Sequence, residues 1–120
     1  MSETAHDIGN RGEDLAAAYL ESKDWLIFDR NYRFEKAEVD IVATDRNYII
    51  FVEVKLRSNT YFGQPEDYIT PQKEANIKKA AEAWIYERKM DTAVVRFDVV
   101  SIVQKNNEAP QITHFKDAFR

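Results

Sequence analysis

Two short stretches of the sequence carry charged residues at alternate positions. Glu38 and Asp40 lie two residues apart in EVDIV, and Glu53 and Lys55 lie two residues apart in IIFVEVKLR. Alternate side chains of a strand point to the same face, about 6.5–7 Å apart along it. This spacing is long for direct contact and suits groups that reach toward one common object. Because a buried charge is costly unless it is paired or bound to a metal, these residues are candidates for chemistry.

The two stretches are joined by the short turn DRNY at 45–48. If Thr44 pairs with Ile49 across this turn, Asp40 lies opposite Glu53 in an antiparallel pair of strands. Two carboxylates placed directly opposite repel each other, and a divalent cation between them would remove the repulsion. Oxygen ligands of this kind, with waters and a substrate phosphate, are what Mg²⁺ prefers. We therefore expect Asp40 and Glu53 to hold Mg²⁺ or Mn²⁺.

The residues next to this pair complete the predicted site. The Val54 carbonyl is a further candidate metal ligand. Lys55 would then orient an attacking water or stabilise charge that develops on a phosphate. The alternative is that Glu53 and Lys55 stand at a solvated edge of the sheet or pair with other residues.

The elements that position these residues follow from hydrophobic periodicity and turn signals. The apolar start of IIFVEVKLR predicts a central strand, and Thr70-Pro71 predicts a helix start. The expected elements are a helix from about Asp7 to Ser22, strands at 25–34, 38–44 and 49–57, a loop at 58–70, a helix from Pro71 to about Met90, a strand at 92–103, a turn at 106–110 and a short strand at 111–115. The order α-β-β-β-α-β-β predicts a fold of the broad α/β class. More closely, it predicts an α+β arrangement in which the helices pack on a central mixed sheet.

Composition bounds the class of protein. The 120 residues are 44% hydrophobic and include no cysteine, so we expect one domain over residues 1–120 without disulfides or thiolate metal sites. No apolar run is long enough to span a membrane, and the polar N-terminus is unlike a signal peptide, so we expect no membrane association and a cytoplasmic protein. The net charge of −4 argues against holding nucleic acid by bulk charge alone. It does not exclude a nucleic-acid enzyme with a local cationic face.

Several polar residues are candidate contacts for nucleic acid. Gln72 and Lys73 open the predicted second helix, and a helix start with a lysine beside it suits a phosphate. Arg30, Arg33 and Arg57 are candidates for contact with a DNA backbone. The alternatives are an ordinary exposed first helical turn and a solvated face.

Other ionisable residues have structural interpretations. Glu13 in the first helix is either an acid favoured by the helix dipole or a contact to the metal or its water. Asp98 lies two positions after Arg96 in one strand, which predicts a structural ion pair. His6 and His114 are isolated near the ends of the sequence, and we assign neither a catalytic role.

An Asp followed thirteen positions later by Glu-x-Lys resembles the nuclease core of restriction endonucleases and archaeal Holliday-junction resolvases. The sequence is more closely similar to the YraN-like family, small bacterial proteins that have been labelled endonucleases. The similarity covers most of the chain. It is carried by the blocks GNRGEDLAAAYL, RNYRFEKAEVDIVA, IIFVEVKLRS, FGQPEDYITPQK and VVRFDVVSI.

This resemblance implies a restriction-endonuclease-like fold and metal-dependent hydrolysis of phosphodiester bonds in DNA, with branched DNA as a candidate substrate. It carries over four catalytic residues, Glu13, Asp40, Glu53 and Lys55. The family usually has Gly where this sequence has Ala37, a change that leaves the charged residues intact. By analogy with dimeric resolvases, the resemblance also implies a homodimer.

Two other functions remain open from the residues themselves. One is a nucleic-acid-binding accessory protein of DNA uptake or repair, which keeps the nuclease fold but cuts little or nothing. The other is a structural or interaction protein in which the charges in the strands form an internal network of ion pairs.

Overall fold

The computed structural model describes residues 5–57, 69–105 and 107–120. The elements are α1 (Ala5–Ser22), β1 (Leu26–Phe34), β2 (Ala37–Thr44), β3 (Ile49–Arg57), α2 (Pro71–Arg88), β4 (Val95–Val103) and β5 (Gln111–Phe119). This order is the predicted α-β-β-β-α-β-β, and the fold is of the mixed α+β kind. Neither helix in the described ranges has the length and apolar character that crossing a membrane requires.

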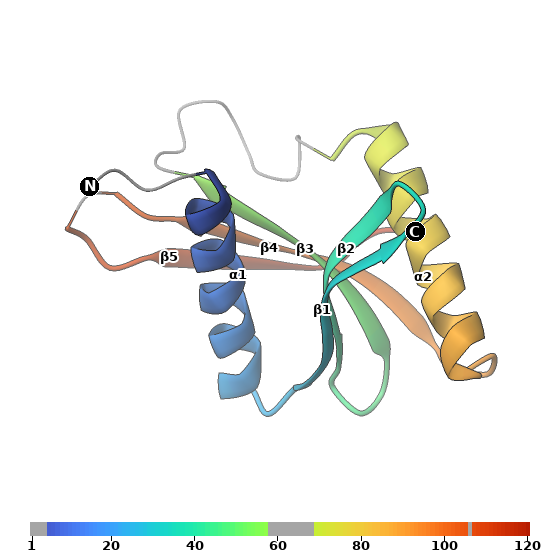
Figure 1. Ribbon diagram of the computed structural model, residues 1–120. Coiled ribbons are helices and arrows are strands. Elements are labelled where there is room, and N and C mark those ends of the chain that lie inside the picture. Colours follow the sequence, from blue (N-terminus) through green and yellow to red (C-terminus); the bar gives the residue numbers. More distant parts are fainter. Residues whose placement is uncertain (1–4, 58–68, 106) are drawn as a thin grey trace.

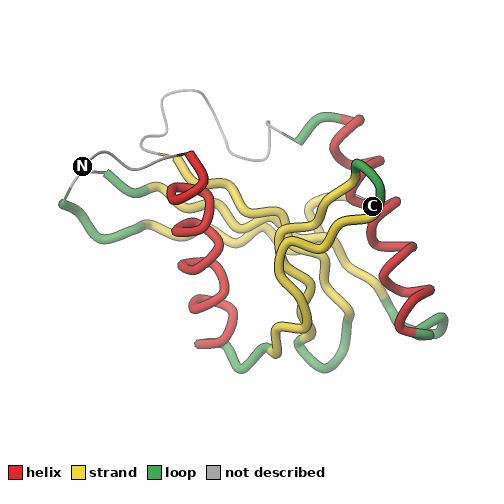
Figure 2. Tube along the Cα trace, viewed as in Figure 1, coloured by secondary structure: helices red, strands yellow, loops and turns green. Residues whose placement is uncertain are grey.

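The five strands form one mixed sheet in the order β1-β2-β3-β4-β5. The first three strands are antiparallel neighbours. Helix α2 then carries the chain back so that β4 lies parallel to β3, and β5 returns antiparallel to β4. Strand β3 therefore lies at the centre of the sheet, as its apolar start predicted. Figure 2 shows the strands as one layer between the two helices.

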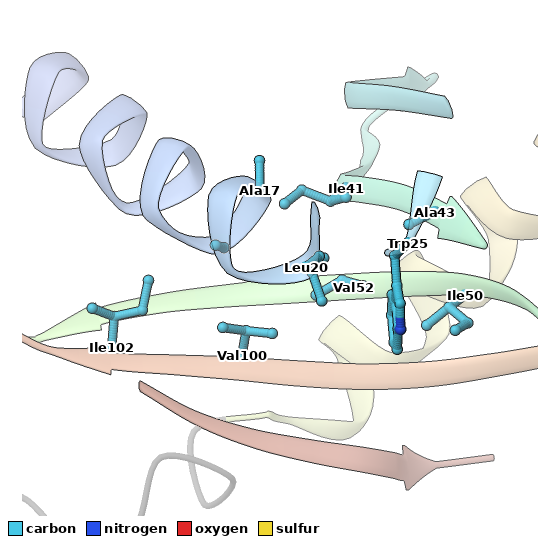
Figure 3. Close-up of a cluster of buried hydrophobic side chains, with 10 residues drawn as sticks. Ala17, Leu20, Trp25, Ile41, Ala43, Ile50, Val52, Val100 and Ile102 are labelled. Carbon is cyan, nitrogen blue, oxygen red and sulfur yellow. The ribbon is translucent and has the colours of Figure 1, made fainter. Parts of the chain in front are cut away.

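Helix α1 covers one face of the sheet and α2 the other (Figure 1). Alternation along β3 separates the two cores, because Val52 belongs to the cluster under α1 and Phe51 to the cluster under α2. Figure 3 shows Ala17 and Leu20 of α1 above the strands. The described members of this buried cluster are Ala16, Ala17, Leu20, Trp25, Ile41, Ala43, Ile50, Val52, Val100 and Ile102.

Helix α2 begins and ends at well-defined caps. Thr70 has an extended backbone and its hydroxyl accepts a hydrogen bond from the Lys73 N–H at 3.1 Å, with Pro71 as the first helical residue. This confirms the predicted start. Lys89 ends the helix in the left-handed conformation, with φ of 55°. The buried face includes Trp84, whose indole N–H donates to Asp29 of β1.

The boundaries differ from the sequence prediction mainly toward the C-terminus. Strand β4 starts three residues later than predicted, and β5 extends to Phe119 rather than ending at Phe115. The extension contains a bulge in which Asp117 has φ of 53° and donates its N–H to the Asp98 carboxylate. Helix α1 starts two residues earlier than predicted. Most of the predicted loop, 58–68, and the first turn residue, 106, lie outside the described residues.

Asp98 forms the centre of a buried polar network that joins β4 to β5. Its carboxylate accepts two hydrogen bonds of 2.8 Å from Arg96, which confirms the predicted ion pair. His114 Nε2 lies 2.7 Å from the same carboxylate, and His114 Nδ1 lies 3.2 Å from the Tyr19 hydroxyl. His114 is therefore part of a network, although the sequence suggested that it was isolated.

Candidate functional site

The carboxylate of Asp40 lies where the pairing of β2 with β3 ends. The two strands pair from Thr44–Ile49 to Ile41–Val52, which is the predicted register. One position beyond the last pair, Asp40 Oδ2 accepts a hydrogen bond of 2.8 Å from the Val54 N–H. A side chain therefore takes the place of a backbone partner, and this fixes the Asp40 carboxylate against β3 beside Glu53.

Glu53 is buried, with 4% of its side chain exposed, and two lysines neutralise it. Lys55 Nζ lies 3.5 Å from Glu53 Oε1. Lys73 Nζ, from the first turn of α2, lies 2.5 Å from the same oxygen. The predicted spacing of about 6.5–7 Å between strand positions does not prevent the first contact, because the long Lys55 side chain spans it. The second contact joins residues twenty positions apart, and the sequence did not predict it.

Asp40, Glu53 and Lys73 line one polar cavity of about 300 Å³ between β2, β3 and the start of α2, and Lys55 lies beside it through its contact with Glu53. Figure 1 shows the first turns of α2 beside the tip of the β1–β2 hairpin. The lining residues are Lys36, Glu38, Asp40, Glu53, Thr70, Gln72, Lys73, Asn76 and Ile77. The cavity therefore brings together four of the predicted site residues: Asp40, Glu53, Gln72 and Lys73.

The charges in this cavity strongly affect one another. Burial, followed by the nearby Glu53 charge, raises the pKa of Asp40 to about 7. Burial also lowers the pKa of Lys55, although Glu53 opposes the change. Burial also tends to lower the pKa of Lys73. The hydrogen bond to Glu53 and the charge of Glu53 outweigh burial, so the pKa of Lys73 is raised. Asp40 therefore holds its proton to a higher pH than an exposed aspartate does, chiefly because it is buried.

Glu13 lies on α1, at the border of this site. Its side chain is nearly buried, and its charge adds to the rise in the pKa of Asp40. Burial raises the pKa of Glu13 itself, opposed by Asn31 and Arg30. Arg30 lies 3.8 Å from Glu13 and 2.7 Å from Asp14. Glu13 therefore influences the Asp40–Glu53 pair through its charge.

Gly12 allows α1 to approach β3 at this point. A Cβ atom added to Gly12 would lie 3.1 Å from the Cβ of Leu56, which is closer than side chains normally pack. Leu56 directly follows Lys55 in β3. The close approach therefore sets the distance between Glu13 and the strand that carries Glu53.

The predicted nucleic-acid contacts are spread over three elements. Gln72 donates to Asn76 within α2 and lines the cavity. Arg33 is exposed on β1, and its guanidinium lies 3.3 Å from Glu38. Arg57 is the last residue of β3 and is half-buried. Among the predicted arginines, Arg30 and Arg33 thus pair with acids near the cavity.

The donor set fits a divalent cation only in part. No group of three or more His, Asp or Glu side chains among the described residues is placed to hold a metal ion by itself. Asp40 and Glu53 supply two carboxylates, which is a typical protein contribution to a Mg²⁺ site when water and a substrate phosphate complete it. Burial and then the neighbouring Glu53 charge raise the pKa of Asp40, and a bound divalent cation would offset the repulsion between the two carboxylates. The site therefore fits a cation that is bound together with its substrate.

Sequence reasoning did not assign several lining residues to the site. Lys36 lies in the turn before β2, so the alternation of Glu38 and Asp40 along the strand does not predict its place in the cavity. Asn76 follows Gln72 by four positions, so the two share a helix face. The helical spacing could therefore have added Asn76 to the predicted site.

Comparison with known proteins places these residues in a family. The sequence profile of the uncharacterised protein family UPF0102 matches residues 12–102, a range that includes Glu13, Asp40, Glu53 and Lys55. A UPF0102 protein of Geobacter sulfurreducens is 47% identical over 112 residues, covering 93% of this chain and 88% of the relative. One from Geotalea daltonii is 44% identical with the same coverage. One from Christiangramia forsetii is 41% identical over 114 residues, covering 95% of this chain and 94% of the relative. The chain belongs to the UPF0102 family, the YraN-like group that its sequence blocks indicated.

Proposed function

We propose that this protein is a nuclease that hydrolyses phosphodiester bonds in DNA with the help of Mg²⁺ or Mn²⁺, and that branched DNA is a candidate substrate. One observation carries the proposal. Asp40 and Glu53, which come from neighbouring strands, line one polar cavity, and Lys55 Nζ lies 3.5 Å from Glu53 Oε1. The element order supports it, because it is the order expected for the restriction-endonuclease-like core that the sequence resembles.

In this proposal the residues at and beside the cavity have distinct tasks. Asp40 and Glu53 would hold the cation, with the Val54 carbonyl as a further ligand. The cation would supply Lewis-acid activation of the phosphate and of the attacking water. Lys55 is mostly buried, with 14% of its side chain exposed, so its ammonium is held in place. The Lys55 ammonium would donate a hydrogen bond to the attacking water, or to a phosphate oxygen on which negative charge develops.

The first turn of α2 would contact the DNA backbone. The Lys73 N–H already donates to Thr70, so the contact would come from the side chains of Gln72 and Lys73. Arg30, Arg33 and Arg57 would add positive charge beside the cavity. The net charge of −4 means that affinity for DNA would depend on these local groups rather than on the whole surface.

A second candidate function is a DNA-binding accessory protein that does not cleave. The short Lys73–Glu53 ion pair favours this function, because the Lys73 ammonium neutralises the Glu53 carboxylate without a metal ion.

The test is a cleavage assay with matched variants. Purified protein is incubated with supercoiled plasmid and with a synthetic four-way junction while Mg²⁺ or Mn²⁺ is titrated. Glu53→Gln removes the buried charge with little change in shape. Glu35→Gln is the control, because Glu35 lies in the β1–β2 turn and pairs with Lys79 of α2 at an exposed position.

Each result selects one of the two functions. Cleavage that requires the cation, disappears in Glu53→Gln and persists in Glu35→Gln supports the nuclease. Binding of the junction by all three proteins without cleavage at any cation concentration supports the accessory protein. Cleavage that survives in Glu53→Gln would show that the activity does not come from this cavity.

A further inference from the structure

The two lysines that contact Glu53 Oε1 are not equivalent. Lys73 Nζ is the nearer, at 2.5 Å, and its side chain is 41% exposed. Lys55 Nζ lies at 3.5 Å, and its side chain is 14% exposed. The shorter contact is therefore made by the side chain that reaches the solvent more easily.

The position of Lys73 in its helix is unfavourable for a cation. Lys73 is the third residue of α2, and the partial positive charge at a helix N-terminus disfavours a positive side chain there. Its backbone is fixed by the bond from its N–H to Thr70, whereas its ammonium depends on Glu53 for neutralisation. The side chain can therefore leave Glu53 without disturbing the helix start.

Oxygen Oε1 of Glu53 is also an atom that a divalent cation needs in the proposed function. Ligation of that oxygen and a 2.5 Å contact with an ammonium ion compete for the same charge and the same space. Lys55 is held in the strand, and most of its side chain is covered. Of the two lysines, Lys73 is thus the one whose ammonium can move away from Glu53 Oε1.

We propose that Lys73 is a positioning residue that occupies Glu53 in the cation-free protein and leaves it when a divalent cation binds. The released ammonium then becomes available to a phosphate of the DNA. This inference rests on the proposed function, because it requires the cation to bind at Asp40 and Glu53. It adds a built-in competitor that makes cation binding and exposure of Lys73 a single coupled event.

The test measures the exposure of Lys73 rather than activity. The full chain is treated with an acetylating N-hydroxysuccinimide ester, with and without Mn²⁺, and modification of each lysine is followed by mass spectrometry. Lys79 is an internal control, because it lies six residues further along α2 and makes a 2.6 Å pair with Glu35. We expect the rate at Lys73 to rise severalfold with Mn²⁺ and the rate at Lys79 to stay the same.

Two variants test the competition between Lys73 and the divalent cation for Glu53. Glu53→Gln should raise acetylation of Lys73 without Mn²⁺, because it removes the carboxylate that holds the ammonium. Lys73→Met should tighten Mn²⁺ binding by about three- to fivefold in calorimetry, the range expected for loss of a half-exposed ion pair. Lys79→Met should leave Mn²⁺ binding unchanged.

The outcomes separate this inference from the proposed function. Mn²⁺ binding that is lost in Asp40→Asn, together with unchanged acetylation of Lys73, would overturn the role of Lys73 and leave the metal site intact. Failure of the wild-type protein to bind Mn²⁺, alone or with uncleaved DNA, would overturn both.

Discussion

Asp40 Oδ2 accepts a hydrogen bond from the Val54 N–H at 2.8 Å, one position beyond the last backbone pair between β2 and β3. The bond fixes the carboxylate beside Glu53, in a cavity where burial and that neighbouring charge raise the pKa of Asp40 to about 7. An asparagine at this position would still offer a side-chain oxygen to Val54. The charge of Asp40 can therefore be removed while the hydrogen bond remains.

We expect Asp40→Asn to stabilise the cation-free protein at pH 8. In the wild-type protein the folded state retains a proton on Asp40 up to about pH 7, whereas the unfolded chain loses it near its ordinary value of 3.8. Because the folded state binds more protons in this window, wild-type stability falls as pH rises from about 4 to about 7. The variant should be more stable by about 1–3 kcal/mol at pH 8 and equal to wild type near pH 4.

Urea unfolding in a chelating buffer at several pH values measures this difference. Asp91→Asn, at an exposed position after α2, is the matched control and should show no such pH-dependent gain. A variant that is less stable than wild type at pH 8 would mean that the Asp40 charge is fully compensated without a cation.

Replacement of Asp98 should have the opposite effect. Although burial alone would raise it, hydrogen bonds from His114 and Arg96 hold the pKa of Asp98 below its ordinary value. This carboxylate therefore stabilises the fold above its unfolded pKa, and the contribution is lost as the pH falls. Asp98→Asn should lower the free energy of unfolding at pH 7 by about 3–5 kcal/mol, because the fully buried carboxylate that Arg96 and His114 contact loses its charge.

Thermal and urea unfolding check the Asp98 prediction, with Asp117→Asn as the control. Asp117 pairs through its side chain with the exposed Arg120, and such a pair is worth about 0–1 kcal/mol. Similar losses in the two variants would show that the network around Asp98 adds little to stability.

The sequence was sufficient to predict the β2–β3 pair, because a short turn leaves little freedom in register. Thr44 faces Ile49 as expected, and this brings Asp40 beside Glu53. The chemistry of Thr70 and Pro71 likewise determined the start of α2. In both cases residues close together in the chain determine the geometry, so local rules apply.

Contacts between distant segments could not be predicted in the same way. The Lys73–Glu53 pair depends on how the α2 crossover returns to β3, and no local spacing encodes that arrangement. The contact of His114 with Asp98 depends on the β4–β5 register, which follows a longer connection. The bulge at Asp117 hid the second half of β5, because it breaks the two-residue alternation of the strand.

Gly12→Val should destabilise the protein, because the added atoms meet Leu56 at the closest approach of α1 to β3. Overpacking of this kind typically costs about 1–3 kcal/mol. Ala18→Val, at an exposed position of α1, introduces the same side chain and should cost less than about 1 kcal/mol. The difference in midpoint of urea unfolding measures the effect, and equal midpoints would mean that Leu56 moves aside freely.

Arg33→Gln should weaken DNA binding in a way that depends on salt. Arg33 is 73% exposed and close to Glu38, so it can reach a phosphate beside the cavity. Losing one such contact should reduce the slope of log affinity against log salt by about one. Band shifts with a four-way junction in a chelating buffer measure the slope. Lys89→Gln, at the far end of α2, should leave it unchanged, and equal slopes in all three proteins would remove Arg33 from the interface.

The two edge strands of the sheet share a feature that affects how molecules of this protein meet. Strand β1 shifts register at Phe28 and has Asn31 at φ of 55°, and β5 carries the bulge at Asp117. A broken edge is a poor template for another strand, because its N–H and C=O groups do not form a regular row. The irregular edges therefore disfavour the pairing of either edge strand with a strand of another molecule.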